Sequence, residues 1–290
     1  MYKIKIWSDV NKDWSRALHN NNKYIKQFAP DNIEFVESVD NADYKIVHII
    51  GENELNLCYP FEKTIPFFYC FLTGSLYPTM FWRDVVKNVP LVLSYYPLNE
   101  WFEEKFNFYR TPLGVDVNIF KRDYRRQKEN AVLSTGYVSE TERIEAFYKA
   151  FSMLGYKVFH VGKDFSFGKN FVYFENVNTE VMVDLYNRSK YVNAIRVVEG
   201  YEIGAIEGGL CGARPICLNN NIYSYWYEDF PIYIKDDGFM TDDEVAEAII
   251  IAVLNDKRKE VTEGEMDWLR NRFNIERVYT DLWRNILSYL

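Results

Sequence analysis

The sequence predicts an α/β protein with two domains, each built on a parallel sheet. Short apolar runs rich in β-branched and aromatic residues alternate with helical patterns along nearly all of the 290 residues. One segment, 112–130, interrupts this alternation with a turn-rich start and a strongly charged end, which is typical of a linker. Because strands that alternate with helices form parallel sheets with crossover helices, the two series indicate two Rossmann-like domains.

The first half contains five expected strands, which are short apolar runs bounded by turn residues: 3–7, 33–37, 44–50, 66–70 and 90–96. Helical patterns lie between them, at 14–28 and 98–106. His48 falls inside the third run, so we expect a strand residue there and not a catalyst.

The second half repeats the same pattern. Its expected strands are 131–136, 156–162, 191–198 and 214–218, and its expected helices are 139–154, 178–189, 242–256 and most of the last thirty residues. We therefore divide the chain at about residue 122, into a domain of residues 1–122 and a domain of residues 123–290.

The composition is that of a globular protein, with 48% hydrophobic and 26% charged residues. A formal net charge of −8 argues against a surface made to hold nucleic-acid phosphates, although a local basic groove stays open. The four cysteines show no CxxC spacing, which indicates buried free thiols in a reducing compartment. The start, MYKIKIWSDV, does not resemble a signal peptide, and we expect a cytoplasmic protein.

The uncharged stretch 65–82 is the nearest candidate for a membrane segment. Pro66, Gly74 and Pro78 interrupt it, so we expect a buried strand, a loop and the start of a helix. The alternative is a weak peripheral membrane contact through its aromatic side chains, which are Phe67, Phe68, Phe71, Tyr77, Phe81 and Trp82.

The segment EGYEIGAIEGGLCGARP, residues 199–215, carries the clearest functional signal. An expected strand ends before it and a helix begins near Ile203, which places it at the carboxyl edge of a parallel sheet, where ligands bind. The free N–H groups of the helix can hold a phosphate, and Glu199 and Glu207 can accept hydrogen bonds from sugar hydroxyls. The alternative is that both glutamates favour the helix N-terminus and face water.

This segment resembles the motif of two glutamates separated by seven residues in retaining GT-B glycosyltransferases of the group 1 family. Four further segments resemble the same family in the correct order: TPLGVDVNIFKR, AVLSTGYVSETERIEAFYKAFSMLGYKVFHVGKD, FENVNTEVMVDLYNRSKYVNAIRV and FNIERVYTDLWRNIL. The resemblance implies two Rossmann-like domains facing across a cleft, with a final helix that returns to the first domain.

The resemblance also implies roles for residues. Glu207 would hold the ribose, and Glu199, as a catalytic residue, would hold the transferred sugar. Backbone groups from Tyr201 through Glu202 and Ile203 to Gly204 would meet the phosphate, near the Gly136 turn, and Val177 would lie near the base. The resemblance implies that no metal is needed, because backbone amides and basic side chains neutralise the leaving diphosphate. It implies no other cofactor, and a nucleotide-sugar, UDP- or GDP-linked, is the donor substrate.

Three positions depart from the family pattern. Tyr137 and Glu142 stand where the family has an Arg and a Lys for the diphosphate, and Glu202 replaces a glycine. The cations that could compensate are Arg143, which we assign as catalytic, Lys163 and Arg196; each could instead be an ordinary solvated or paired cation. A carboxylate at residue 202 should repel a phosphate, so it must turn outward, bind a hydroxyl or indicate an altered ligand.

The sequence therefore predicts a glycosyltransferase that acts on a saccharide, lipid-linked or protein acceptor. A degenerate member that binds a nucleotide, a sugar or a partner without turnover is the alternative. Glycosylation of modified bases in DNA is a third hypothesis, which the net acidity disfavours.

Overall fold

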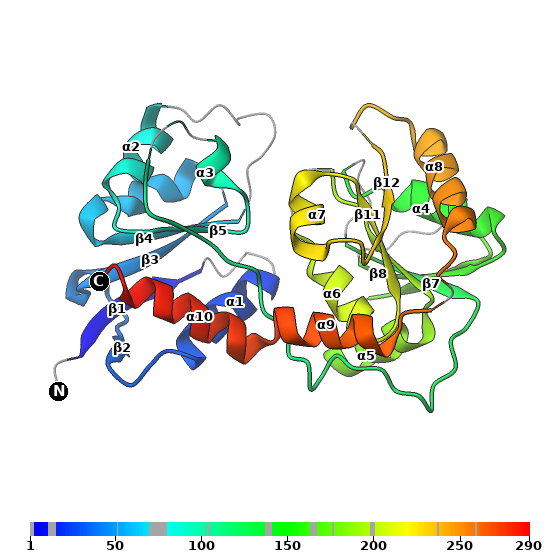
Figure 1. Cartoon of the computed structure of the whole chain (residues 1–290), viewed down its shortest axis with the longest axis horizontal. Helices are drawn as coiled ribbons and strands as arrows, with labels where there is room; N and C mark the ends of the chain where they lie inside the picture. Colours follow the sequence, from blue (N-terminus) through cyan, green and yellow to red (C-terminus); the bar gives the residue numbers. More distant parts are fainter. Residues whose placement is uncertain are drawn as a thin grey trace. The chain divides into compact units, whose positions relative to one another are not determined.

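The structure of the protein, a computed structural model, describes residues 3–10, 16–50, 52–69, 80–101, 103, 105–136, 141–162, 167–175, 177–197, 201–236, 238–258 and 260–290. The chain forms two compact units. The first unit is Met1–Gly114 with Ile275–Leu290, and the second is Val115–Asn274. Figure 1 labels the helices and strands of both.

The described part of the first unit is built on a parallel sheet of six strands in the order β2-β1-β3-β4-β5-β6. The strands are β1 (Ile4–Asp9), β2 (Ile33–Phe35), β3 (Tyr44–Ile49), β4 (Thr64–Phe68), β5 (Val92–Ser94) and β6 (Phe108–Arg110). The α-helices are α1 (Arg16–Gln27), α2 (Met80–Asn88), α3 (Leu98–Trp101) and α10 (Ile275–Leu287), and the 3-10 turns are η1 (Val39–Asn41), η2 (Glu52–Cys58) and η3 (Phe61–Lys63). Helices on both faces bury β3 and β4 almost completely, as is usual for the central strands of such a sheet (Figure 1).

The second unit has a parallel sheet whose described strands, again six, follow the order β12-β11-β10-β7-β8-β9. They are β7 (Ala131–Gly136), β8 (Lys157–Gly162), β9 (Phe171–Phe174), β10 (Tyr191–Ala194), β11 (Arg214–Leu218) and β12 (Ile232–Ile234). The helices are α4 (Ile144–Met153), α5 (Thr179–Arg188), α6 (Ile203–Leu210), α7 (Asn221–Tyr227), α8 (Asp242–Asn255) and α9 (Glu263–Phe273). Helices α4 and α8 cover one face of this sheet, and α5, α6 and α9 lie on the other (Figure 1).

These observations confirm the predicted fold class. The strands β6, β9 and β12 and the helix α7 were not predicted, and the helix expected at 98–106 is the shorter α3. Cys58, Cys211 and Cys217 are free and buried, as predicted, whereas Cys70 lies outside the described residues.

The stretch considered for a membrane contact enters the core of the first unit. Phe67 and Phe68 are 1% and 0% exposed in β4, so they are not available to a lipid surface and that part of the alternative is wrong. The side chains of Phe71, Tyr77, Phe81 and Trp82 are outside the described set. No helix within the described residues has the length and apolar character that crossing a bilayer requires.

The last helix, α10, belongs to the first unit, where it packs against α1. Trp283 donates from Nε1 to the carbonyl oxygen of Ile25 at 2.8 Å, and the hydroxyl of Tyr279 donates to Asn21 Oδ1. Asn21 in turn donates from Nδ2 to the hydroxyl oxygen of Tyr69. The chain therefore returns to the first unit through specific buried hydrogen bonds as well as through apolar packing.

His48 continues this network across the sheet. Ser8 donates its hydroxyl proton to Asn22 Oδ1 at 2.7 Å, so its oxygen must accept from His48 Nε2, 3.1 Å away. His48 Nδ1 is then the acceptor for the hydroxyl of Tyr69, at 2.7 Å. The network therefore requires a neutral imidazole with its proton on Nε2.

The need for a neutral His48 should make the free energy of unfolding depend on pH in the acidic range. Burial, and to a smaller extent the charge of Lys26, lowers the pKa of His48 from 6.5 to about 3. The unfolded chain binds this proton more readily than the folded chain does. The contribution of His48 to the free energy of unfolding is therefore complete above pH 6.5 and is lost as the pH drops toward 3. Protonation of this one group should lower the free energy of unfolding by about 2 kcal/mol between pH 7.5 and pH 5.

Urea unfolding at both pH values tests this expectation, with H48Q as the matched variant because its amide can still donate to Ser8. We expect the difference in unfolding free energy between the two pH values to be smaller in H48Q than in the parent chain. Equal differences in the two proteins would contradict the assignment.

Candidate functional site

The candidate site lies where the strands of the second unit end. Because the sheet is parallel, β7, β8 and β10 bring their carboxyl ends to the same edge. Gly136 and Gly162 end β7 and β8, Arg196 follows β10, and the N-terminus of α6 begins at Ile203. This is the edge at which open α/β sheets bind ligands.

Arg196 is a buried cation at this edge, with 5% of its surface exposed. Its guanidinium donates to the carbonyl oxygens of Ile195 (2.9 Å) and Thr135 (3.0 Å). Nε lies 3.1 Å from Glu202 Oε2, and Nη2 lies 3.8 Å from Glu142 Oε2. Two carboxylates therefore surround one guanidinium.

Glu202 turns inward, toward the sheet. It is the N-cap of α6, and its Oε1 accepts a hydrogen bond from the backbone N–H of Gly204 at 3.2 Å. The hydroxyl of Tyr227 lies 3.1 Å from the backbone nitrogen of Glu202 and 2.9 Å from its carbonyl oxygen. Both the backbone and the side chain of Glu202 are thus held by the protein.

Glu142 lies over the glycine turn that ends β7. Gly136 has φ of +107°, a conformation that favours glycine, and a Cβ built there would lie 2.0 Å from Glu142 Oε2. Asn193 Nδ2 holds the backbone of Glu142 by donating to its carbonyl oxygen at 3.2 Å. The predicted departure at residue 142 therefore places a carboxylate directly at the sheet edge.

Sequence analysis gave His160 no role, yet its ring lies at the same edge. Burial, together with the nearby charge of Arg196, lowers the pKa of His160 from 6.5 to about 4, so the ring is neutral. Nδ1 lies 3.3 Å from Ser134 Oγ, and Nε2 has no hydrogen-bond partner in the described structure. A Cβ on Gly162 would lie 2.0 Å from the carbonyl oxygen of Gly136 and 2.8 Å from this Nε2, so no side chain larger than that of glycine fits there.

Glu207 is oriented by Tyr186, a residue to which the sequence pattern assigned no role. The buried hydroxyl of Tyr186, from α5, donates to Glu207 Oε2 at 3.1 Å. Burial, followed by the negative charges of Glu207 and Glu202, raises the pKa of Tyr186, which keeps its proton available for this bond. Tyr186 is twenty-one residues from Glu207, and nothing in the quoted motif points to it.

Arg143 is the N-cap residue of α4, and its guanidinium pairs with residues that follow β12. Its guanidinium makes a buried ion pair with Asp236, at 2.7 Å, contacts Asp242 at 3.3 Å and donates to the carbonyl oxygen of Met240 at 2.8 Å. These partners raise its pKa against the effect of burial. The arrangement favours a structural role for Arg143 in place of the catalytic role expected from its neighbour Glu142.

Of the remaining predicted residues, two lie within the described part of the chain and three lie outside it. The ring of Tyr201 is 4% exposed and packs against Trp226, 5.7 Å between ring centroids, so its contribution to a site is limited to its backbone. Val177 is half-buried just after β9, at the same sheet edge. Glu199, Lys163 and Tyr137 lie outside the described residues.

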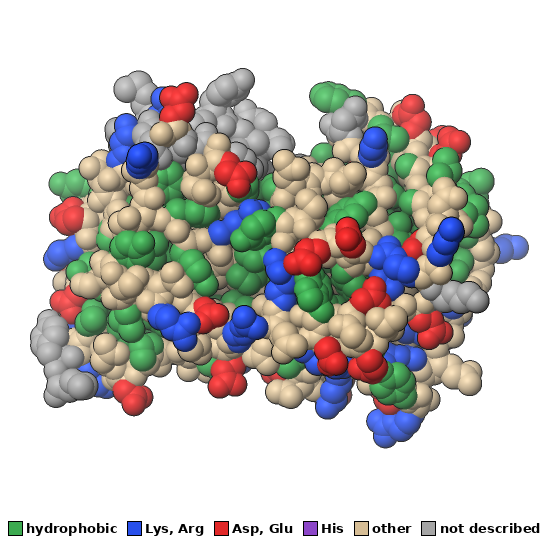
Figure 2. All heavy atoms as spheres, viewed as in Figure 1, with side chains coloured by type: hydrophobic (Ala, Val, Ile, Leu, Met, Phe, Trp, Pro, Cys, Tyr) green, Lys and Arg blue, Asp and Glu red, His purple; other side chains and the backbone are tan. Residues whose placement is uncertain are grey.

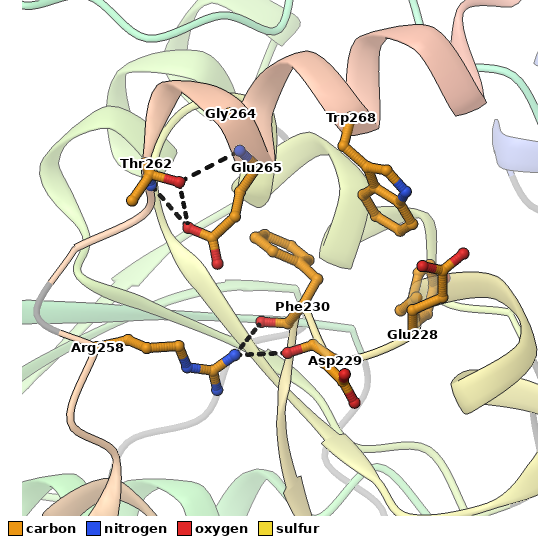
Figure 3. A pocket seen from close by; sticks show the side chains of 9 residues that line it. Glu228, Asp229, Phe230, Arg258, Thr262, Gly264, Glu265 and Trp268 are labelled. Atoms are coloured by element: carbon orange, nitrogen blue, oxygen red, sulfur yellow. Dashed lines mark hydrogen bonds between the residues drawn. The ribbon is translucent and has the colours of Figure 1, made fainter.

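One pocket of the second unit lies near the opposite edge, before β12 begins (Figure 3). Trp268 and Phe230 form its apolar wall, and Arg258 lies across from them. Arg258 donates to the carbonyl oxygens of Asp229 and Phe230, and Glu265 forms the capping box of α9 with Thr262. Because these polar groups bind one another, we assign them to the stability of the unit.

The charges exposed on the surface are mixed in sign. On the face drawn in Figure 2, acidic and basic side chains alternate over the described residues, without an extended basic region. No group of three or more His, Cys, Asp or Glu side chains in the described ranges has a geometry that could hold a metal ion.

Comparisons with known proteins support the architecture. No protein-family model matches the chain, and a search of curated protein sequences finds no match. Several solved structures are similar in fold. HepE from Anabaena, in complex with UDP and glucose, has a TM-score of 0.73 at 12% identity and is covered in full by the whole chain.

Two further structures agree with this result. A glycosyltransferase from Rickettsia africae has a TM-score of 0.68 at 12% identity over 99% of this chain and 100% of its own. Sucrose-phosphate synthase from Thermosynechococcus elongatus has a TM-score of 0.67 at 11% identity over 97% and 81%. From its two parallel sheets, the α10 helix that returns to the first unit and these likenesses, we conclude that the chain has the GT-B fold.

Proposed function

We propose that this protein is a glycosyltransferase that moves a sugar from a nucleotide-sugar to an acceptor hydroxyl, with retention and without a metal. The observation that carries the proposal is the placement of Glu207, held by Tyr186, on the first turns of a helix that begins at the carboxyl edge of the second sheet, beside the buried Arg196. The fold likeness to HepE, which was solved with UDP and glucose, supports it.

In this proposal each described group has one task. Glu207 accepts hydrogen bonds from the ribose hydroxyls of a UDP- or GDP-linked donor, and Val177 lies near the base. The N–H groups at Ile203 and Gly204 and the guanidinium of Arg196 stabilise the negative charge that develops on the leaving diphosphate as the sugar–oxygen bond breaks. Glu199 and Lys163 keep their predicted roles at the sugar and the phosphate.

The acceptor is proposed only as a class, namely a saccharide, a lipid-linked sugar or a protein. Glycosylation of bases in DNA is disfavoured by the net charge of −8 and by the mixed charges in Figure 2. A degenerate protein that binds the nucleotide without turnover is the second candidate, because two carboxylates surround Arg196.

Donor binding is the first test. A thermal-shift screen with UDP, GDP, ADP and CDP should raise the melting temperature with one of them by a few °C at a hundredfold excess over Kd, because that excess stabilises the folded state by about 2.7 kcal/mol. In E207A the same nucleotide should bind at least about tenfold more weakly, since charge-assisted hydrogen bonds to the ribose are lost.

The matched control is E263A, which removes an exposed glutamate at the first residue of α9, in a different helix from Glu207. It should keep the nucleotide affinity of the parent chain. Equal affinity in E207A and the parent chain would refute the ribose assignment, and bound donor without transfer or hydrolysis would favour the degenerate protein.

Tyr186 should act as a positioning residue for Glu207. Y186F keeps the ring and removes only the hydroxyl that donates to Oε2, so donor KM should rise about three- to tenfold, the worth of one such bond, with a smaller change in kcat. Steady-state kinetics with the donor found by the screen measures both constants. Y233F removes a hydroxyl that donates to the carbonyl oxygen of Glu228 at 2.7 Å, and it should leave KM unchanged. A fall in kcat with constant KM in Y186F would contradict the positioning role.

The structural role expected of Arg143 can be measured separately. R143M leaves Asp236 buried without its main cation, so the free energy of unfolding should fall by about 3–5 kcal/mol. R284M, which breaks an exposed pair with Asp281, should change it by about 1 kcal/mol or less. Urea denaturation compares the two, and a small loss in R143M would return Arg143 to the list of catalytic candidates.

A further inference from the structure

Glu202 makes contacts with two different donors at once. Oε1 accepts from the Gly204 N–H at 3.2 Å, and Oε2 pairs with Arg196 Nε at 3.1 Å. One donor is the N-terminus of an eight-residue helix and the other is a guanidinium whose side chain is 6% exposed. A helix N-terminus together with an arginine is an arrangement that proteins use to bind phosphate.

A third buried polar group, His160, lies close enough to Arg196 that burial and the charge of the guanidinium together lower the pKa of the imidazole. His160 Nε2 is buried without a hydrogen-bond partner among the described residues, and it lies at the Gly162 end of β8. Glycine at 136 and at 204 lets a carboxylate approach the backbone, since a Cβ on Gly136 would lie 2.0 Å from Glu142 Oε2. At Gly204, a Cβ would lie 2.9 Å from Glu202 Oε1, so the carboxylate reaches the N–H only because no side chain intervenes.

Among the described residues, the carboxylates around Arg196 outnumber its positive charge. Glu142 and Glu202 contribute two negative charges within 3.8 Å of the single positive charge of Arg196. A phosphate placed at the helix N-terminus would meet Glu202 at contact distance, where like charges repel strongly in a partly buried site. The ligand and the carboxylate cannot hold the same two donors together.

We propose that Glu202 is an internal anion that occupies the phosphate position of the site and competes with the donor diphosphate for Arg196 and the Gly204 N–H. The inference rests on the proposed function, and it makes residue 202 a determinant of how tightly the site binds phosphates. Binding of a diphosphate requires rotation of the Glu202 side chain, while the Tyr227 hydroxyl keeps its backbone in place.

A purely structural role is the alternative. In that case Glu202 would only cap α6 and neutralise Arg196, and its loss would destabilise the unit without improving the binding of any anion. The proposed role therefore predicts tighter anion binding when the carboxylate is removed, whereas the purely structural role predicts no gain.

The test uses E202Q, which keeps the shape and the acceptor for Gly204 N–H but removes the charge. Isothermal titration with inorganic pyrophosphate should show binding at least about tenfold tighter in E202Q than in the parent chain, and pyrophosphate should raise the melting temperature of the variant more. E265Q is the matched control, because it breaks a similar Arg–Glu contact, 2.8 Å from Arg214, at the opposite edge of the unit; its pyrophosphate affinity should equal that of the parent chain.

E202S is the second variant, in case E202Q does not fold. Its hydroxyl can cap α6 but is too short to reach Arg196, and it should show the same gain in pyrophosphate affinity. Affinity that is unchanged or weaker in a folded variant would overturn the inference.

The two proposals fail in different ways. If E202Q gains pyrophosphate affinity and no nucleoside diphosphate binds the parent chain or E202Q, the internal anion stands and the transferase proposal fails. If the parent chain binds a nucleotide and E202Q gains nothing for pyrophosphate, the transferase proposal stands and the role of Glu202 fails.

Discussion

The organisation of the candidate site depends on the burial of the Arg196 guanidinium. A charge with so little exposure must be matched by acceptors, and here they come from separate segments of the chain. The carbonyl of Thr135 ties it to the end of β7, that of Ile195 to the end of β10, and Glu202 to the start of α6. One side chain therefore fixes how two strands and a helix meet.

The first unit shows the same constraint with neutral groups. The hydroxyl of Tyr279 donates to Asn21, the amide of Asn21 donates to Tyr69, and the hydroxyl of Tyr69 donates to His48. This series of hydrogen bonds connects α10 through α1 to the central strands. Because the hydroxyl protons of Tyr279 and Tyr69 are both donated along this series, the network specifies the tautomer of His48 and the position of α10 together. Buried polar groups thus determine which segment returns to which sheet.

The fold was predictable because alternating apolar and helical periods survive in single sequences. The strands β6, β9 and β12 have three or four residues each and show little periodicity; β2 and β5 are as short, but they lie within the longer apolar runs 33–37 and 90–96 and were predicted from them. The position of Glu202 was predictable, but its direction was not, since rotamers depend on partners distant in sequence. Arg143 and Arg196 looked equivalent as cations until Asp236 and Glu202 separated them, and Tyr186 and His160 carried no local signal.

In the role proposed for it, Glu202 acts differently on the donor and on the product of the transfer reaction. In the donor the terminal phosphate is esterified to the sugar, whereas the released nucleoside diphosphate carries an additional charge. Repulsion by Glu202 should therefore weaken the product more than the donor, which favours release, while it also reduces stabilisation of the charge that forms as the bond breaks. The outcome for turnover depends on which step is slower, so a glycine-to-glutamate difference at this position is compatible with activity when product release limits the rate.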